Sequence, residues 1–342
     1  MAQRDVVVVG ASAGGVEAIT KLLSPLPADL PACVLVVLHT PPSGVNALAT
    51  ILDRVTALRV VAAQGETPLA RGTVIVARPD HHLLVVDDRA ILTRGPRENG
   101  HRPAVDVLFR SAARALGPRV IGVVLSGALD DGSAGLVSVR NEGGVAVVQD
   151  PRDASQPSMP RSAIAAVTPD VVLPVADLPA ALMELIGVEV PQSVPGPDHH
   201  LLEQEIAVSR MDPEAIDAHQ RPGVAAGLSC PDCHGPLFEI DENGYLRYRC
   251  RVGHAWSVQS LLAQTDAALE GALWMALRTL EEKSSLAADM GERATQRDQP
   301  LAAARFNDQA TESRSAAGLI RRMLLERSDD GDGSPAEAAE SA

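Results

Sequence analysis

Short runs of Val, Ile and Leu alternate with segments of helical periodicity through the first half of the chain. This alternation limits the fold more than any other feature. Runs that are apolar throughout are typical of parallel strands buried on both faces of a sheet, and strands alternating with helices indicate an α/β domain. We therefore predict that residues 5–187 of the 342 form a doubly wound parallel sheet, a three-layer αβα arrangement of Rossmann-like type.

Strands and helices can be assigned segment by segment in this region. The expected strands are 6–9, 33–38, 60–61, 73–76, 83–86, 120–125, 145–149 and 171–173. The expected helices are 16–23, 45–53, 104–116, 134–141 and 178–186. Between residues 65 and 94 the apolar runs follow one another with no helix between them, which predicts a hairpin-rich inset.

The first strand runs into a glycine-rich turn, VVVVGASAGG at residues 6–15, with Ser12 at its apex. The pattern G-x-S-x-G matches a nucleophile elbow, in which a strand-to-helix turn holds a serine hydroxyl above the sheet. A dinucleotide-binding loop would need glycine where Ser12 stands, because the backbone there approaches a pyrophosphate closely. The turn thus indicates either a serine nucleophile or an ordinary glycine-rich connection.

Two other chemically apt positions also follow expected strands. His39 comes directly after the second expected strand, and Asp130 and Asp131 come after the sixth. Because the carboxyl ends of parallel strands face one crevice, these side chains can meet Ser12 there. A serine nucleophile needs a base and a group that orients the base, so these positions predict a Ser-His-Asp site. Each residue could instead be a cap or a turn residue, and the competing bases are His81, His82 and His101.

The composition excludes several classes of protein. A formal net charge of −14 argues against binding nucleic acid through its phosphates. No apolar stretch reaches the length of a membrane helix, and the first residues do not form a secretory signal. We therefore expect no membrane insertion and a cytoplasmic location. Four cysteines, three of them clustered, indicate a reducing compartment and a metal site, not disulfides.

The clustered cysteines have the spacing of metal ligands. Cys230, Cys233, Cys250 and His254 form the pattern C-x2-C-x16-C-x3-H, and thiolates with an imidazole suit tetrahedral zinc. His234 is an alternative imidazole, but it adjoins Cys233 and is poorly placed. A redox-active CxxC pair is another reading, which the second matched pair argues against. Because four ligands fill a tetrahedral site, we predict a structural zinc ion and no metal in catalysis.

The second half of the chain divides by composition. We expect a Pro-rich linker at its start, a small zinc ribbon with a hairpin turn at Asn243-Gly244, an antiparallel helical pair broken at 298–300, and a disordered acidic tail. An apolar stripe along the helices predicts that they pack on each other or on the ribbon, and contact with a signalling partner is the alternative. The expected boundaries are 191–228 for the linker, 229–256 for the ribbon, 257–327 for the helices and 328–342 for the tail.

Six motifs stand in order along the first half of the chain. They are GASAGG at 10–15, LHT at 38–40, RPDHHLLV at 78–85, HRPAVDVLF at 101–109, LSGALDDGSAGL at 125–136 and QDPRDASQPSMPRSAI at 149–164. Together they resemble the chemotaxis protein-glutamate methylesterase family, that is, CheB-type catalytic domains. The resemblance assigns residues 1–190 to the catalytic domain.

The resemblance implies an activity and a set of site residues. The activity is hydrolysis of glutamate methyl esters on chemoreceptors with release of methanol, and deamidation of receptor glutamines in some members. No cofactor is implied for catalysis. Ser12 would be the nucleophile, His39 the base and Asp131 the orienting group, because the family's aspartate directly precedes a glycine. The oxyanion would be bound by backbone N–H groups at Ala13 and Ala128, where many members have Thr and Met.

Two further expectations concern the rest of the molecule. The segment CRVGHAWS resembles the tail of some stand-alone members of the family. Most members begin with a phosphorylatable receiver domain, whereas the first catalytic strand here starts at Val6. We therefore expect no receiver domain, and control by a partner, a separate protein or the C-terminal extension. The alternatives to a methylesterase are a non-catalytic signalling scaffold that keeps the esterase fold and a small-molecule carboxylesterase.

Overall fold

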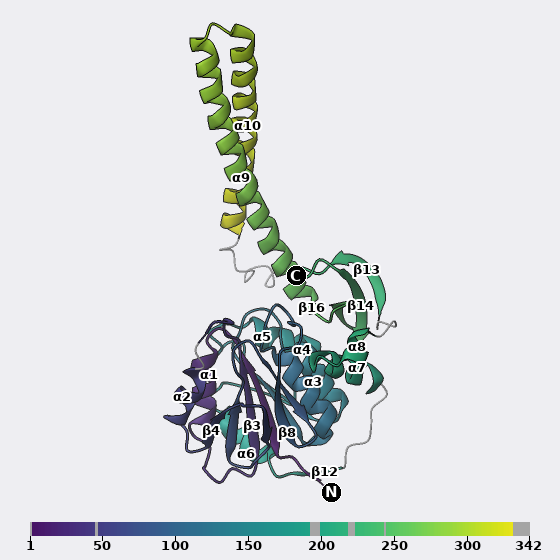
Figure 1. Cartoon of the computed structure of the whole chain (residues 1–342). Helices are drawn as coiled ribbons and strands as arrows, with labels where there is room; N and C mark the ends of the chain where they lie inside the picture. Colours follow the sequence, from purple (N-terminus) through teal and green to yellow (C-terminus); the bar gives the residue numbers. More distant parts are fainter. Residues whose placement is uncertain (1, 45–46, 192–198, 218–222, 243, 331–342) are drawn as a thin grey trace, which may run out of the picture. The chain divides into compact units, whose positions relative to one another are not determined.

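The computed structural model describes residues 2–44, 47–191, 199–217, 223–242 and 244–330 (Figure 1). The chain forms two compact units, Met1–Leu262 and Ala263–Ala342. The first contains every residue singled out above as a site candidate. Each unit is described by itself.

A seven-stranded sheet forms the centre of the first unit. Its order is β11-β10-β9-β2-β3-β6-β4, and all of its neighbouring strands are parallel. The doubly wound parallel sheet expected from the sequence is therefore confirmed. The strands are β2 (Val6–Ala11), β3 (Cys33–Leu38), β4 (Arg59–Ala62), β6 (Thr73–Val76), β9 (Val120–Val124), β10 (Val145–Gln149) and β11 (Val171–Leu173).

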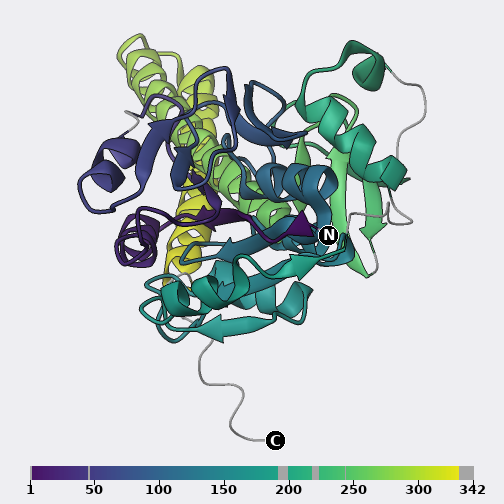
Figure 2. The same ribbon diagram turned by 90° about the horizontal axis from the view of Figure 1, so that it is seen from below.

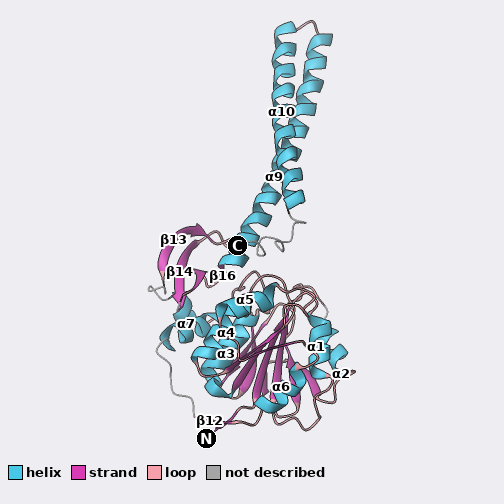
Figure 3. Cartoon of the chain, turned by 180° about the vertical axis from the view of Figure 1, so that it is seen from behind, coloured by secondary structure: helices cyan, strands magenta, loops and turns pink. Residues whose placement is uncertain are grey.

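Helices cover both faces of this sheet (Figures 1 and 3), and Figure 2 shows them from a perpendicular direction. Side chains alternate along each strand, so Val7 and Val9 lie in one apolar core and Val6 and Val8 in the other. The helices α1 (Gly15–Leu23), α2 (Ala47–Asp53) and α6 (Leu178–Leu185) complete the first core, and α3 (Val105–Leu116), α4 (Ser133–Asn141) and α5 (Ser158–Ala166) complete the second. Residues 45–46 of the expected second helix lie outside the described residues.

Smaller elements fill in the remainder of this half. The hairpin-rich inset is confirmed as a three-stranded antiparallel sheet, made of β5 (Glu66–Pro68), β8 (Arg89–Thr93) and β7 (His82–Val86). The short strand β1 (Ala2–Gln3) pairs with β12 (Glu189–Val190), and a 3-10 turn, η1 (Gly117–Arg119), precedes β9. Helix α5 was not expected from periodicity, because its burial rests on only Met159, Pro160 and Ala163.

The segment expected to be a linker contains ordered elements. Helices α7 (His199–Ser209) and α8 (Pro213–Asp217) lie within it, and β13 (Val224–Ser229) completes it. Helix α7 packs against α3, with Glu205 buried beside Arg110. Part of the packing of α7 is polar, so its sequence has only a weak apolar periodicity. The sequence pattern therefore did not predict this helix. Residues 192–198 and 218–222 lie outside the described residues.

A second sheet follows, with the order β13-β14-β15-β16. We call it the Cys-rich sheet. Its strands are antiparallel: β14 (Pro236–Glu242) pairs with β15 (Tyr245–Cys250), and β15 pairs with β16 (Ala255–Ser257). The expected hairpin therefore forms, although Asn243 itself lies outside the described residues. Its small apolar core consists of Cys230, Leu237, Cys250, Trp256 and Leu261.

The helical pair expected at the end of the chain is present. Helices α9 (Val258–Gln296) and α10 (Pro300–Asp330) share an apolar seam that includes Leu277, Ala317 and Leu324. From residue 331 onward the expected acidic tail lies outside the described residues. Among the helices described, none combines the length and the apolar character needed to cross a membrane.

Acid should weaken the first unit through His82. The imidazole Nε2 contacts the carbonyl oxygen of Pro96 at 2.9 Å, and Nδ1 accepts from the N–H of Ala104 at 3.2 Å. Burial lowers the pKa of His82 to about 4, below the value of about 6.5 in an unfolded chain. Between these pH values the unfolded state binds more protons, so stability falls as the pH falls through that window.

We expect His82 to contribute a loss on the order of 3 kcal/mol in unfolding free energy between pH 6.5 and about pH 4. Denaturant unfolding across this range measures it, with His82→Gln as the comparison. Glutamine can keep both hydrogen bonds but cannot titrate. An equally steep pH dependence in wild type and His82→Gln would contradict the assignment.

Candidate active site

Three strand ends bring the predicted side chains to one edge of the sheet. Ser12 follows β2, His39 follows β3, and Asp131 lies just beyond β9. Because β3 and β9 are the two neighbours of β2, the strand order reverses here, which is where open α/β sheets bind ligands. Backbone hydrogen bonds hold the turns in place, from Ser12 N to Ser126 O at 2.9 Å and from His39 N to Ala11 O at 3.1 Å.

His39 and Asp131 form a buried, charge-assisted pair. The imidazole Nε2 lies 2.6 Å from Oδ2 of Asp131, and the two side chains are 5% and 2% exposed. The same carboxylate accepts the backbone N–H of Val105 at 2.6 Å and of Asp106 at 3.2 Å. These N–H groups begin helix α3, where the helix dipole favours an anion.

The environment of Asp131 keeps it ionised. Burial by itself would raise its pKa, but the hydrogen bond and charge of His39, together with the N–H of Val105, hold the pKa well below its usual range. An ionised carboxylate on Nε2 fixes the proton of a neutral imidazole on that nitrogen. Nδ1 of His39 is then left with a lone pair.

That lone pair is the available base of the site. Among the residues that the structure describes, Nδ1 of His39 is buried and has no hydrogen-bond partner. The described contacts also include no hydrogen bond between His39 and the hydroxyl of Ser12. Nucleophile–base hydrogen bonds are often long without substrate and tighten in the complex. The arrangement therefore offers a serine, a base and an orienting carboxylate at one edge.

The other candidate residues lie elsewhere or serve differently. Asp130 contacts Ser257 and Ser260, not His39. Nδ1 of His81 contacts Pro79 O at 3.0 Å, and His82 is buried in the contacts described above.

His101 belongs to the site without contacting a carboxylate. Its ring stacks on that of His39, with centroids 3.6 Å apart and planes inclined by 13°. Burial and the charge of His39 lower the pKa of His101 to about 4. His101 is therefore neutral near pH 7, and it limits the rotation of the His39 ring.

A hollow of about 400 Å³ opens beside His39. Arg102 on its wall is paired with Asp80 at 2.5 Å, whereas no ion pair involves the Arg97 guanidinium within the described part of the chain. The hollow thus presents an available positive charge near the base. Its lining is His39, Thr40, Pro41, Pro42, Arg97, Gly100, His101 and Arg102.

The turns next to Ser12 carry backbone N–H groups that are available as hydrogen-bond donors. Gly14 has φ +73°, which lets the turn lead directly into α1. The loop after β9 lies against Ser12, since a Cβ at Gly127 would lie 2.9 Å from the Ser12 Cβ. Within the described residues the N–H groups of Ala13 and Ala128 have no partner in the chain. Two free donors beside a serine are what a developing oxyanion requires.

Two residues of the site were missed by sequence reasoning. Asn99 donates from Nδ2 to Asp106 and to Asp131, each at 3.0 Å. Asp106 accepts the N–H groups of Gly132 at 2.9 Å and Gly135 at 2.7 Å, and burial, reinforced by the charge of Asp131, raises its pKa. Asp106 lies within the motif HRPAVDVLF, and the dipeptide Asn99-Gly100 is typical of a turn. Neither feature predicts a contact with Asp131.

The Cys and His residues of the second sheet do come together. The ligand atoms of Cys230, Cys233, Cys250 and His254 all lie within 4.8 Å of one another, a cluster that could hold a metal ion. We call it the metal cluster. His234 is not part of it. Cys33, by contrast, is buried alone in β3, where burial raises the pKa of its thiol to about 12.

The separations within the metal cluster suit a tetrahedral ion. Nδ1 of His254 lies 3.7 Å from the sulfur of Cys230 and 3.5 Å from that of Cys250, and the Cys233 and Cys250 sulfurs are 3.6 Å apart. Zinc bound at about 2.3 Å to sulfur and about 2.0 Å to nitrogen sets ligand separations of roughly 3.5–3.8 Å. On the far side of the ring, Nε2 of His254 lies 3.8 Å from Oδ2 of Asp232.

Comparison with known proteins agrees with this fold. The family model described as CheB methylesterase matches residues 7–182. The catalytic domain of Thermotoga maritima CheB methylesterase superimposes with a TM-score of 0.51 at 32% identity, covering 53% of this chain and 98% of that one. The chain therefore belongs to the CheB methylesterase family.

Curated relatives bear related names. "Protein-glutamate methylesterase/protein-glutamine glutaminase 2" of Methanosarcina mazei is 38% identical over 191 residues, which are 54% of this chain and 52% of that protein. A "putative protein-glutamate methylesterase/protein-glutamine glutaminase" of Leptospira interrogans is 37% identical over 170 residues, 49% of this chain and 88% of that protein. The chain spans about half the length of the first of these relatives.

Proposed function

We propose that the chain is a protein-glutamate methylesterase that hydrolyses glutamate methyl esters on chemoreceptors in a chemotaxis-like signalling pathway. The observation that carries the proposal is the buried His39–Asp131 pair, at 2.6 Å, on the sheet edge that also carries Ser12. Family membership supports it, and so do the names of the relatives. Those names also support deamidation of receptor glutamines by the same site, since both reactions replace a leaving group on one carbonyl carbon.

The proposed mechanism is acyl transfer through Ser12. Nδ1 of His39 takes the hydroxyl proton as the serine oxygen bonds to the ester carbonyl carbon, and Asp131 stabilises the resulting imidazolium. The N–H groups of Ala13 and Ala128 bind the oxyanion. Methanol leaves with the proton from His39, and the serine remains as an ester of the receptor glutamate. Water, activated in the same way, then releases the free carboxylate and restores Ser12.

The two alternatives explain less of the site. A scaffold would have no use for an ionised carboxylate buried against an imidazole whose other nitrogen is free. A small-molecule carboxylesterase would favour an acyl pocket without charge, whereas the hollow beside His39 includes Arg97. This cation suits a substrate side chain that lies among other acidic groups on a protein.

The proposal also covers the domain boundaries, the cellular location and the partner contacts of the chain. We assign residues 1–190 to the catalytic domain, 229–256 to a zinc-binding unit and 257–327 to a helical pair. We place the protein in the cytoplasm, where chemoreceptors present their modified glutamates. We assign contact with a signalling partner to α9 and α10, which expose Trp274, Met275 and Leu319.

Methanol release tests the activity. The purified chain, incubated with methylated receptor fragments, should release methanol, and a chromogenic short-chain ester should be a poor substrate because it makes no contact with the cationic hollow. Methanol is measured enzymatically and receptor carboxylates by mass spectrometry. Hydrolysis of the short ester alone would favour the general esterase, and turnover of neither substrate would favour the scaffold.

Substitutions in the triad test the mechanism. Ser12→Ala or His39→Ala should lower turnover by about 10³-fold or more, and Asp131→Asn by about 10⁴-fold, because asparagine favours the wrong imidazole tautomer. The losses should not multiply in double variants, since the three residues act as a unit. Asp130→Asn is the matched comparison. An inactive Asp130→Asn together with an active Asp131→Asn would overturn the assignment of the orienting group.

We propose that the metal cluster holds one structural zinc ion. Its donor set and separations fit zinc, and four protein ligands leave no open coordination position. Metal analysis should find one zinc per chain, and Cys233→Ser should lower that content. Chelation should unfold the Cys-rich sheet, because its apolar core is small. A full complement of secondary structure in metal-free protein, or purified protein without zinc, would contradict the assignment.

A further inference from the structure

Asn99 connects the catalytic edge to the Cys-rich sheet. Its Nδ2 bridges the buried carboxylates of Asp131 and Asp106, each at 3.0 Å. Its Oδ1 accepts the backbone N–H of Ser257 at 2.8 Å, and its own backbone N–H donates to the carbonyl oxygen of Ala255 at 2.8 Å. Every polar group of the Asn99 side chain is thus occupied, with the carboxylates on one side and β16 on the other.

The backbone of Asn99 belongs to a tight turn. Asn99 and Gly100 have φ values of +53° and +77°, and Glu98 and His101 on either side exchange backbone hydrogen bonds at 3.2 and 2.8 Å. Two consecutive left-handed residues suit an Asn-Gly pair. The neighbouring Glu98 also forms a bridge with Ala255, so the turn that carries Asn99 is attached to β16 on one side.

A second contact reaches the same catalytic loop. Asp130, the residue before Asp131, accepts the hydroxyls of Ser257 at 2.6 Å and Ser260 at 3.0 Å. Burial raises the pKa of Asp130, which these hydroxyls partly counteract. The strand β16 and the first turn of α9 therefore contact both aspartates of the loop, Asp130 directly and Asp131 through Asn99.

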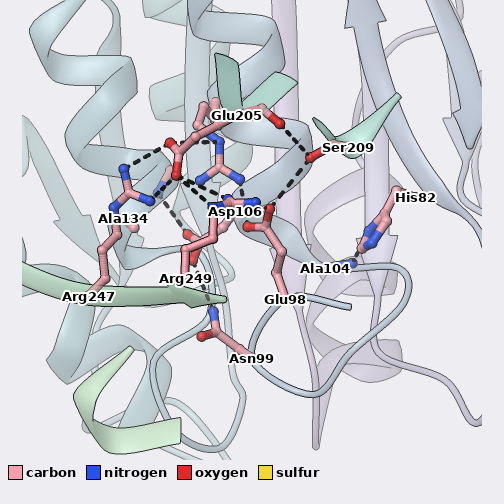
Figure 4. Close-up of polar contacts among 12 residues, drawn as sticks. His82, Glu98, Asn99, Ala104, Asp106, Ala134, Glu205, Ser209, Arg247 and Arg249 are labelled. Carbon is pink, nitrogen blue, oxygen red and sulfur yellow. Dashed lines mark hydrogen bonds and ion pairs between the residues drawn. The ribbon is translucent and has the colours of Figure 1, made fainter. Parts of the chain in front are cut away.

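A buried ion-pair cluster fixes the Cys-rich sheet against α3 and α7 (Figure 4). Arg249 of β15 lies 2.8 Å from Glu98 and 3.0 Å from Glu205, and Arg110 of α3 lies 2.5 Å from Glu98. Arg247 also pairs with Glu205. All of these side chains are buried. Burial would raise the pKa of Glu205, but the guanidiniums hold it well below its usual range.

Two residues of the metal cluster lie shortly before β16, the strand that contacts Asn99. Cys250 ends β15, His254 immediately precedes β16, and only residues 251–253 lie between them. The carbonyl oxygen of His254 also accepts the backbone N–H of Cys250 at 2.9 Å. An ion bound by both residues would therefore fix the starting point of β16, three residues before Ser257.

We propose that Asn99 is a positioning residue for Asp131, and that the metal cluster, by securing β16, keeps Asn99 in place and so makes ester hydrolysis depend on a metal that is remote from the reacting atoms. This goes beyond the expectation of a structural zinc ion, because the ion would influence catalysis without taking part in it. The kinetic part of the proposal rests on the proposed methylesterase function. The geometric part does not.

The physical effect follows from what Asn99 separates. Asp131 and Asp106 are two buried carboxyl groups that share one amide donor. Without that donor Asp131 keeps the N–H groups of Val105 and Asp106 but loses the amide that bridges it to Asp106. The carboxylate is then held less firmly against Nε2 of His39, and the imidazole proton is less strictly confined to that nitrogen. Asn99 does not line the hollow beside His39, so kcat should fall with little change in KM.

Asn99→Gly in the full chain is the direct test. Glycine keeps the left-handed backbone and removes the amide. We expect kcat for methanol release to fall about 10- to 100-fold with KM within about twofold. The ¹⁵N shifts of the His39 ring, recorded at about pH 8 where imidazoles are neutral, should show a smaller fraction of protonated Nε2.

The matched control is Asp87→Gly. Asp87 also has a left-handed backbone, with φ +51°, but it is exposed and lies in the turn between β7 and β8. It should leave kcat and the His39 signals as in wild type. The methyl signals of Leu52, which is buried in the core on the other face of the sheet, report whether the first half of the chain is still folded.

Zinc removal tests the longer connection. Chelation of the full chain should lower kcat and alter the His39 signals while leaving the methyl signals of Leu52 unchanged, and added zinc should restore kcat and the His39 signals. In Asn99→Gly, chelation should have less than about a twofold further effect, because both changes act at the same step.

Several results would overturn the proposal. They are wild-type kcat and tautomer in Asn99→Gly, no response of His39 to chelation, effects of the two changes that multiply, or loss of the native Leu52 methyl signals together with the His39 signals. The last would show that the metal supports the whole unit and not Asn99 in particular. An absence of methanol release by wild type, with the predicted His39 changes intact, would sink the proposed function and leave the positioning role standing.

Discussion

The burial of one ionised carboxylate governs the arrangement of this molecule. Asp131 is 2% exposed, and an unpaired charge at that depth would cost several kcal/mol. It is stabilised by partners from separate parts of the chain: the His39 imidazole, the N–H groups that begin α3, and the Asn99 amide. Each partner is in turn fixed by its own element. The loop after β9, the start of α3 and the segment before it therefore have to be assembled together, and the site exists only where they meet.

Much of this could be predicted from the sequence, because it follows from local patterns. Apolar runs gave the strands of the parallel sheet, several of them to the residue. The rule that carboxyl ends of parallel strands converge pointed to Ser12, His39 and the pair Asp130–Asp131, and the family resemblance singled out Asp131. The ligand spacing likewise indicated Cys230, Cys233, Cys250 and His254, which the structure brings within 4.8 Å. A short motif carries its own geometry, so neither inference required knowledge of distant contacts.

What could not be predicted depends on long-range polar contacts. Helix α7 lies where composition indicated a linker, and it is held partly by Glu205 among arginines, a contact that leaves no apolar period to detect. Asn99 lies 32 residues from Asp131 and 158 from Ser257. Neither separation has a sequence signature. A buried asparagine and an exposed turn asparagine look alike in the sequence, and only the fold distinguishes them.

The contact between the Cys-rich sheet and the catalytic half is mainly polar. This polar character explains why the contact would suit control of the catalytic site. Buried ion pairs add little net stability compared with apolar packing, but they tolerate few alternative arrangements. Without their partners, Glu98 and Arg110 would retain each other, and Glu205 would lose the two arginines of β15. Docking of this sheet is therefore strongly dependent on its strands being formed, and those strands enclose little apolar core of their own. A metal ion bound by the metal cluster would supply the missing folding free energy and, as proposed above, would act on the catalytic loop through geometry alone, without contributing a ligand, a charge or a proton to the reaction.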